Sequence, residues 1–201
     1  MQTFVISSDS TCDLYSDYVV QNEIAVVPLR YTMDKDGSLT EHEDSFTEYS
    51  QYVDFYAQLR AGGFSRTSML NHEAHLSHFE KLIAAGAKEI VHVSLSGGLS
   101  PTANVAAQAA AEAEQKHPGC KIYPVDSLAA TIGQGALVRE AVRLRAEGKS
   151  AAETASALRE MPLHIQYSII ANDLFYLMRG GRVSAVAAAA GTLLKVKPVL
   201  S

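Results

Sequence analysis

Short apolar runs rich in β-branched residues alternate along the chain with longer amphipathic stretches. Four of these runs predict strands, at residues 4–6, 25–29, 89–93 and 121–125. Strands that alternate with helices pair in parallel and are joined by right-handed crossovers. The pattern therefore predicts an α/β fold whose N-terminal part is a parallel, Rossmann-like domain.

Capping signals delimit the helices between these strands. Residues 45–48 read as a capping box, Ser-Phe-Thr-Glu, at the start of one helix. Ser100 as cap and Pro101 at the first helical position start an alanine-rich helix that runs to Lys116. A further helix is predicted over residues 128–147, before Gly148.

A second lobe is predicted after a capping box at residues 150–153, so that the domains are residues 1–160 and 161–201. A strand over 164–170 opens this lobe, and helical segments follow around 174–178 and 185–194. Residues 196–201 predict an apolar strand with nothing to cover it, which indicates either a truncated lobe or one completed by another chain. Self-association through this strand is expected.

Composition and charge exclude several classes of protein. The 201 residues are 47% hydrophobic and 19% charged, as in ordinary globular proteins, and the net charge of −5 argues against nucleic-acid binding. No apolar run reaches membrane-spanning length and no signal sequence is evident, so we expect a cytoplasmic protein without stable membrane insertion. Cys12 and Cys120 lack the spacing of a disulfide framework or a zinc site. Neither metal nor cofactor is expected.

Small hydroxyl residues follow the predicted strands, and ligands of parallel α/β sheets bind at the carboxyl ends of the strands. Side chains and backbone donors of this kind can hold a carboxylate or a phosphate, although the same residues also cap helices and form turns. The candidate ligand-binding residues at this edge are Ser10, Thr11, Thr67, Ser68, Ser96, Gly97 and Ser127.

Catalytic and nucleotide-binding motifs are missing. The sequence has no P-loop, no GxGxxG after the first strand and no GxSxG, so neither ATP binding nor a serine nucleophile is indicated. His92 is interpreted as a packed strand residue, and Gly133-Gln134-Gly135 as a site of close helix packing. His72, His75 and His78 are interpreted as a solvated helix face, and residues 41–44 as a solvated acidic loop.

Arg179-Gly180-Gly181-Arg182 places two cations around a Gly-Gly turn at the end of a short predicted helix. The segment fits a helix C-cap with favourably placed cations. It equally fits delivery of Arg182 from the second lobe to an anionic head group.

In this order, the motifs resemble the DegV family over nearly the whole chain. The segments that carry the resemblance are 9–11, 13–14, 27–29, 55–56, 67–68, 94–102, 125–127, 133–135, 179–184 and 194–198. Two positions depart from the family pattern: Gly97 replaces a second serine, and Pro101 replaces a glycine.

The resemblance implies a two-lobed protein that encloses a long-chain fatty acid, with the carboxylate between the lobes and the acyl chain in an apolar tunnel. Such bacterial proteins are similar to the binding subunit of fatty acid kinase, which holds the acid while a separate kinase subunit phosphorylates it. The family's head-group residues map onto Thr67 or Ser68, Ser96 and Arg182. Family members continue past Lys197-Pro198 and supply a histidine that contacts the carboxylate.

Two other functions remain open at this point. One is a phosphotransferase or hydrolase that uses Ser96 or Ser10 as nucleophile at the same hydroxyl-rich edge. The other is a truncated interaction module that binds no lipid and pairs through its final strand.

Overall fold

The computed structural model describes residues 4–35, 37–170, 174–194, 196–197 and 199–200. The chain forms two compact units, Met1–His164 and Ile165–Ser201. Lys195, Pro198 and Ser201, which belong to the C-terminal motif and final strand predicted above, lie outside the described residues.

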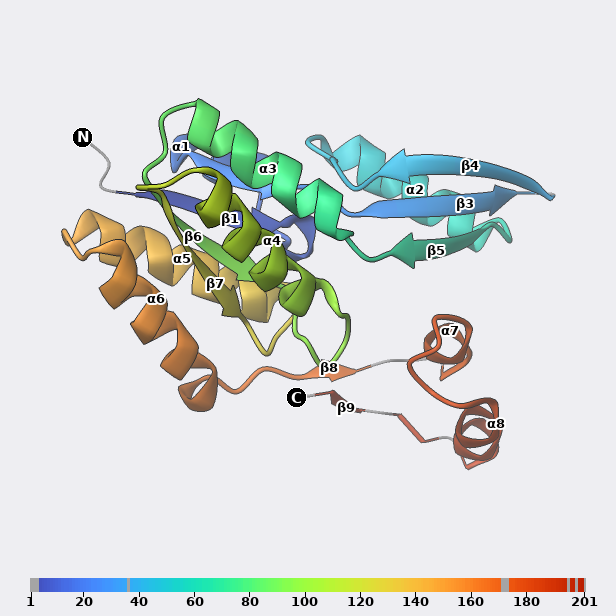
Figure 1. Cartoon of the computed structure of the whole chain (residues 1–201). Helices are drawn as coiled ribbons and strands as arrows, with labels where there is room; N and C mark the ends of the chain where they lie inside the picture. The colour runs from blue at the N-terminus through green and yellow to red at the C-terminus, as the bar shows by residue number, and fades with distance from the viewer. Residues whose placement is uncertain (1–3, 36, 171–173, 195, 198, 201) are drawn as a thin grey trace. The chain divides into compact units, whose positions relative to one another are not determined.

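The first unit is built around a four-stranded parallel sheet in the order β2-β1-β6-β7 (Figure 1). The four predicted strands are thus confirmed, each within a few residues. Chain order reverses between β1 and β6, so the switch point, where such folds bind ligands, lies between their carboxyl ends. The strands are β1 (Val5–Asp9), β2 (Ile24–Val27), β6 (Glu89–Ser94) and β7 (Lys121–Asp126).

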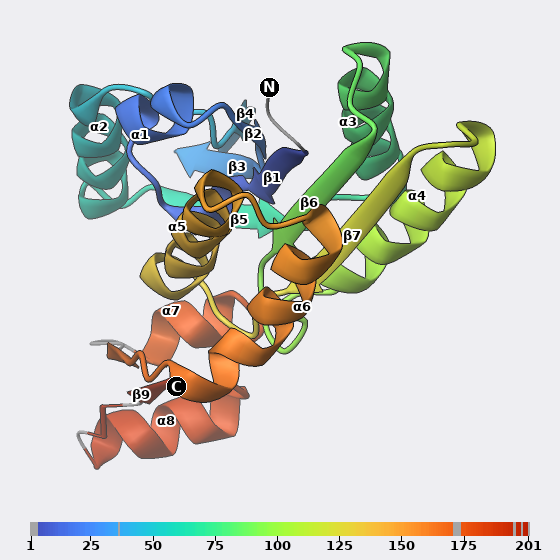
Figure 2. The same ribbon diagram turned by 90° about the vertical axis from the view of Figure 1, so that its left-hand side faces the viewer.

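Helices cover both faces of this sheet (Figure 2). One face carries α3 (His72–Ala84) and α4 (Thr102–Lys116), and the other carries α5 (Ile132–Ala146) and α6 (Ala151–Glu160). A short helical turn η1 (Ser10–Cys12) and α1 (Ser16–Gln21) connect β1 to β2, and η2 (Met161–His164) ends the unit.

The predicted start of the helix at Leu128 is wrong by four residues. Leu128 and Thr131 both have a φ of 49°, which a right-handed helix excludes, and α5 therefore begins at Ile132. The capping box predicted at residues 45–48 is also shifted, because Glu48 caps α2 (Tyr49–Arg60) in partnership with Gln51. The box between Ser150 and Glu153 is confirmed.

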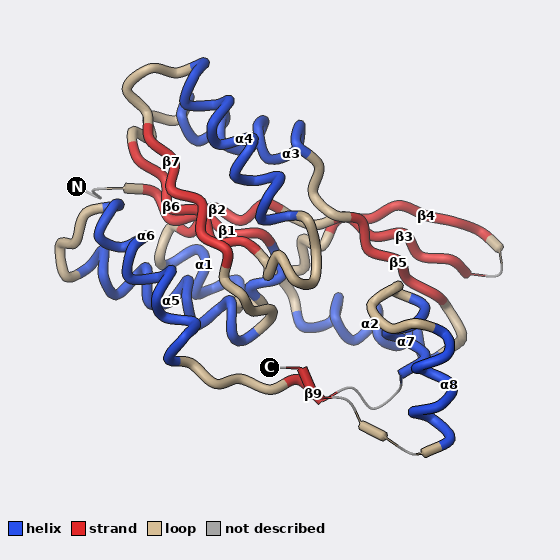
Figure 3. Tube along the Cα trace, turned by 60° about the horizontal axis from the view of Figure 1, so that its bottom comes forward, coloured by secondary structure: helices blue, strands red, loops and turns tan. Residues whose placement is uncertain are grey.

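A second sheet, which the sequence pattern did not reveal, follows β2 directly. It is antiparallel in the order β4-β3-β5 and stands beside the parallel sheet (Figure 3). The interpretation of residues 41–44 as a loop is wrong for 41–43, which are exposed residues of a strand. The strands are β3 (Arg30–Lys35), β4 (Ser38–Glu43) and β5 (Phe64–Ser68).

The core beneath α3 and α4 contains Phe79, Ile90, Ile122 and the buried alanines of α4. Small alanine side chains let α4 approach both α3 and the sheet closely, so large side chains from the sheet and α3 fill the space between them. Phe79 is completely buried, as expected for the central side chain of such a layer.

Three histidines belong to this same layer, and the interpretation of the α3 histidines as a solvated face is wrong for two of them. His75 is completely buried, and the Nε2 atom of His78 lies 2.8 Å from the hydroxyl of Ser7 on β1. The Nδ1 atom of His92 lies 2.8 Å from the same hydroxyl, which confirms His92 as a packed strand residue. Burial lowers the pKa of His75 and of His78 to about 4 and holds that of His92 well below its usual range, so all three stay neutral at pH 7.

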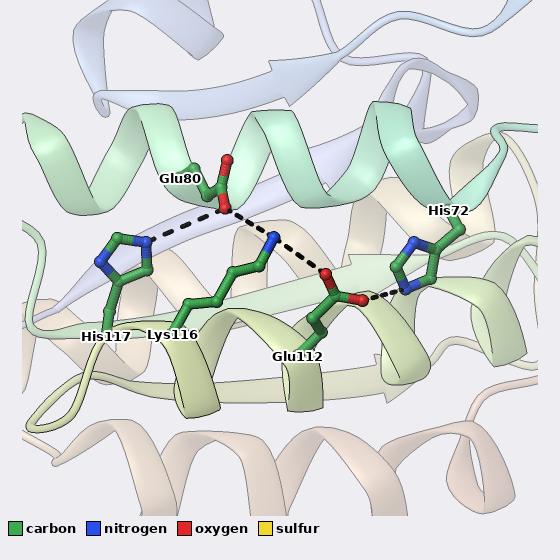
Figure 4. Close-up of polar contacts among 5 residues, drawn as sticks. All are labelled: His72, Glu80, Glu112, Lys116 and His117. Atoms are coloured by element: carbon green, nitrogen blue, oxygen red, sulfur yellow. Dashed lines mark hydrogen bonds and ion pairs between the residues drawn. The ribbon is translucent and has the colours of Figure 1, made fainter.

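The outer seam between α3 and α4 is polar (Figure 4). Lys116 bridges Glu112 on its own helix, at 2.9 Å, and Glu80 on α3, at 3.4 Å. His72 and His117 extend this chain of contacts to Glu112 and Glu80 respectively. These side chains are well exposed, so packing rather than ion pairing holds the two helices together.

The second unit contains β8 (Ile169–Ile170), α7 (Leu174–Arg179), α8 (Ala185–Leu193) and β9 (Val199–Leu200). Both predicted helices are confirmed. The strand predicted over 164–170 is only two residues long, because His164 ends a 3₁₀ turn. The final strand was predicted to have no neighbour, but β9 pairs antiparallel with β8.

Candidate functional site

Asp9 is the last residue of β1 and lies at the switch point between β1 and β6, where its carboxylate is completely buried. It accepts hydrogen bonds from the backbone N–H of Leu95, at 2.8 Å, and from the side-chain amide of Gln134, at 2.9 Å. The backbone N–H of Thr11 and its hydroxyl donate to the same carboxylate. Burial raises the pKa of Asp9, and these hydrogen bonds offset part of that rise.

Gln134 lies within the Gly-Gln-Gly segment that the sequence interpretation assigned to close packing, and the structure confirms this role. A β-carbon on Gly135 would stand 2.5 Å from the carbonyl oxygen of Cys12, so only glycine lets α5 approach η1. This approach brings the Gln134 amide to Asp9 and to the Ser8 hydroxyl, 3.1 Å away. The two glycines signalled close packing in the sequence, but no sequence feature indicated the hydrogen bonds of Gln134.

Ser96 follows β6 in a tight turn. Its side chain is 8% exposed, and its hydroxyl accepts a hydrogen bond from the N–H of Gly98 at 3.2 Å. Its own N–H donates to the carbonyl of Ala129 at 2.9 Å, which ties the turn to the loop after β7. Within the described residues the hydroxyl proton of Ser96 has no acceptor, so the group retains a donor for a ligand.

Gly97 holds this turn against Asp126 at the end of β7. Its N–H lies 3.1 Å from both carboxylate oxygens of Asp126, and an added β-carbon would come within 2.7 Å of one of them. The N–H of Leu128 donates to the same carboxylate. The backbone donor of Gly97 is therefore already used within the protein.

Ser10, Thr11 and Ser127 also use their hydroxyls internally. Ser10 accepts from the N–H of Leu29, at 3.0 Å, and its hydroxyl contacts Asp44. The completely buried Ser127 donates to the carbonyl of Ala129 and accepts from its N–H. These interactions shape the loops at the carboxyl edge of the sheet.

Thr67 and Ser68 lie on β5 in the antiparallel sheet, opposite Tyr31 and Arg30 of β3. Both are exposed on an edge strand. No hydrogen bond joins either residue to the Ser96 turn in the part of the chain that the structure describes.

Arg182 lies in the second unit, immediately after the turn that ends α7. The N–H of Arg182 donates to Leu177 O and that of Gly181 to Met178 O, both at 2.9 Å, and Gly181 has a φ of 77°. These features define a Schellman motif and confirm the C-cap interpretation of this segment. The guanidinium is exposed and donates to the carbonyl of Gly180.

Catalytic arrangements receive little support from this geometry. Among the described residues, Ser7 is the serine whose hydroxyl contacts histidine rings, and it is completely buried beneath α3, where a substrate cannot reach it. No cluster of three or more potential metal ligands occurs among the described residues. None of the described helices combines the length and the apolar character needed to cross a bilayer. Cys12 and Cys120 are both free thiols.

Comparison with known proteins identifies the fold. Among solved structures, a stearic acid-binding protein from Eubacterium ventriosum is 28% identical to this chain, with a TM-score of 0.77. The match covers 98% of this chain and 66% of the Eubacterium protein. A DegV family protein from Thermus thermophilus, described for its fatty acid binding, is 28% identical with a TM-score of 0.74, over 98% of this chain and 67% of its own.

Curated sequences give the same relationship. The DegV domain-containing protein YteA of Lactococcus lactis is 33% identical over 98% of this chain, and a Clostridium perfringens DegV domain-containing protein is 34% identical over all of it. The chain spans about two thirds of the length of these relatives. The family profile described as "Uncharacterised protein, DegV family" matches residues 3–201, and the chain therefore belongs to the DegV family.

Proposed function

We propose that this chain binds a long-chain fatty acid and presents it to a separate fatty acid kinase subunit. The observation that carries the proposal is the likeness in fold, over 98% of the chain, to proteins described as binding stearic acid and other fatty acids. The donor that Ser96 retains at the carboxyl edge of the sheet supports it, because an ionised head group needs hydroxyl and cationic donors.

The proposed head-group residues are Ser96, Thr67 or Ser68, and Arg182, and the acyl chain would lie in an apolar tunnel. Arg182 would supply the positive charge that an ionised carboxylate requires. Gly97, Ser10, Thr11 and Ser127 support the site through the hydrogen bonds that shape its loops.

We propose further that the chain performs no chemistry of its own and works in the cytoplasm. The kinase subunit would phosphorylate the bound carboxylate to an acyl phosphate. Two free thiols, one of them buried, fit a reducing compartment.

Mass spectrometry of an organic extract of the purified chain tests the binding proposal. We expect a stoichiometric fatty acid, and a roughly ten- to hundredfold weaker affinity in Ser96→Ala and Arg182→Ala, because each removes a hydrogen bond to a charged group. Ser156→Ala and Arg60→Ala are matched controls at exposed positions and should bind normally. A chain that carries no lipid and takes none up when offered it would overturn the proposal for residues 1–201.

The kinase proposal has its own assay. The lipid-loaded chain is incubated with a fatty acid kinase subunit and ATP, and acyl phosphate is trapped with hydroxylamine. Product should form only when both proteins and ATP are present. Product formed from the chain and ATP alone would show that it is an enzyme itself.

A further inference from the structure

A cavity lies in the first unit, and its lining does not include the Ser96 turn. It has a volume of about 230 Å³ and is lined by the segment from η1 to α1, the end of β2, and the residues that precede and begin α2. Leu14, Val19 and Val26 give it apolar walls. Its volume is below the roughly 300–1,000 Å³ of drug-sized ligand pockets, so a smaller molecule fits it.

Two carboxylates line this cavity, those of Asp13 and Asp44. Loss of hydration raises the pKa of both, and the charge of Asp44 raises that of Asp13 further. No lysine, arginine or histidine in the described part of the chain forms an ion pair with either carboxylate. Asp44 is half-buried whereas Asp13 is exposed. A half-buried charge without a counter-ion is costly, and a cationic ligand that contacts both carboxylates would reduce that cost.

Aromatic rings are the second, independent feature of the cavity. Phe46 and Tyr52 both line it, with ring centroids 5.0 Å apart and ring planes at 81°. The phenol oxygen of Tyr52 also lies 3.4 Å from the carbonyl oxygen of Phe46, a second contact between the two residues. Aromatic faces attract cations whose charge is surrounded by carbon, as in quaternary ammonium groups.

We propose that this cavity binds a small organic ammonium ion with a short apolar body. Asp13 and Asp44 supply the complementary charge, Phe46 and Tyr52 the aromatic contacts, and the aliphatic walls accommodate the carbon substituents. Fatty acids are unsuited to it because their carboxylate would meet two like charges. The cavity shares Ser10 with the loops that shape the proposed lipid site, but its two carboxylates suit a ligand of the opposite charge.

Titration of the full chain with choline, followed by NMR or calorimetry, tests this inference. 3,3-Dimethyl-1-butanol has nearly the same shape without the charge and should bind at least tenfold more weakly. Phosphocholine separates a free ammonium compound from a lipid head group, and its phosphate should weaken binding through repulsion by the two carboxylates. Equal binding of choline and the neutral alcohol would overturn the proposal, as would tighter binding of phosphocholine than of choline.

Variants locate the ligand. Asp44→Asn should weaken choline binding roughly fivefold, whereas Asp54→Asn, an exposed carboxylate elsewhere on α2, should leave it unchanged. Tyr52→Leu should also weaken it, and Tyr49→Leu, which is 83% exposed and outside the cavity, should not. The aspartate pair and the tyrosine pair test the site separately. If one variant fails to fold, the other pair still shows whether the cavity binds choline. Choline binding that neither Asp44→Asn nor Tyr52→Leu reduces would overturn the assignment to this cavity.

Discussion

Gly135 illustrates how a single atom can control this fold. Gly135→Ala would place a β-carbon 2.5 Å from the Cys12 carbonyl oxygen, a backbone atom that cannot rotate away. We expect a loss of about 1–3 kcal/mol in the free energy of unfolding, measured by urea denaturation. Gly97→Ala should cost less, because its β-carbon meets the rotatable carboxylate of Asp126. An unchanged midpoint for Gly135→Ala would contradict the close approach of α5 and η1.

The buried histidines predict an acid-sensitive fold. The unfolded chain binds protons on His75 and His78 near pH 6.5, whereas the folded protein does so only near pH 4. Each residue therefore lowers the free energy of unfolding, by up to about 1.4 kcal/mol per pH unit, as the pH falls from 6.5 to 4. The nearby charges of His72 and Lys81 act in the same direction, while the raised pKa of Asp9 opposes it.

His75→Phe isolates this contribution. Both ring nitrogens of His75 lack a hydrogen-bond partner among the described residues, so phenylalanine, similar in shape, loses no polar contact. Urea denaturation at several pH values should give a flatter pH dependence for His75→Phe than for the native chain. His164→Gln, at an exposed position, should keep the native slope. Identical slopes in all three proteins would mean that His75 is already protonated in the fold.

The residue-level predictions from sequence succeeded where the signal was local. The Ser150–Glu153 box and the Gly180–Gly181 turn depend on neighbours within a few positions. The bond from Gln134 to Asp9 spans 125 positions, and the contact from Ser7 to His92 spans 85. The periodicity of apolar residues carries no information about contacts over such distances. Sequence analysis therefore assigned these residues to helices and strands but could not identify their partners.

At the scale of elements, packing rather than ion pairing should hold α3 to α4. Phe79→Ala should cost about 3–5 kcal/mol, because the side chain is completely buried in the layer between α4 and the sheet. Lys116→Met, which removes the bridge to Glu80 and Glu112, should leave the urea midpoint almost unchanged since these groups are exposed. A larger effect for Lys116→Met than for Phe79→Ala would reverse this ranking.

The antiparallel sheet escaped sequence analysis for a physical reason. All six residues of β4 are exposed, so its sequence shows no alternation of apolar and polar positions. Asp36-Gly37 between β3 and β4 was an available hairpin signal, because Asp-Gly is typical of two-residue turns. The parallel strand β6, by contrast, was predicted from its buried β-branched residues Ile90, Val91 and Val93.

At the scale of the whole molecule, the small sheet of the second unit predicts self-association. β8 and β9 are two residues each, and their paired residues Ile170 and Val199 are 63% and 58% exposed. Sedimentation should show assembly that grows with concentration, because such a sheet has open edges. Val199→Lys should reduce it, whereas Val186→Lys, on α8 and 81% exposed, should not. A chain that stays monomeric at every concentration would exclude this interface.

The overall α/β class and the family followed from the sequence, because strand and helix periodicity and the order of motifs extend over the whole chain. The cavity beside Asp13 and Asp44 did not. Its walls come from three separate stretches, and neither carboxylate stands in a recognisable motif. Sites assembled from distant segments become visible only once the chain is folded.

The central position of β1 has a consequence for synthesis. Among the strands of its sheet β1 is made before the others, and β2 can pair with it soon afterwards, but its other partner, β6, follows only after the antiparallel sheet and α3 have been made. The nascent chain therefore carries an open strand edge for much of its translation, and such edges invite pairing with other chains. Nascent DegV chains of this type should be clients of chaperones that act at the ribosome until β6 completes the sheet.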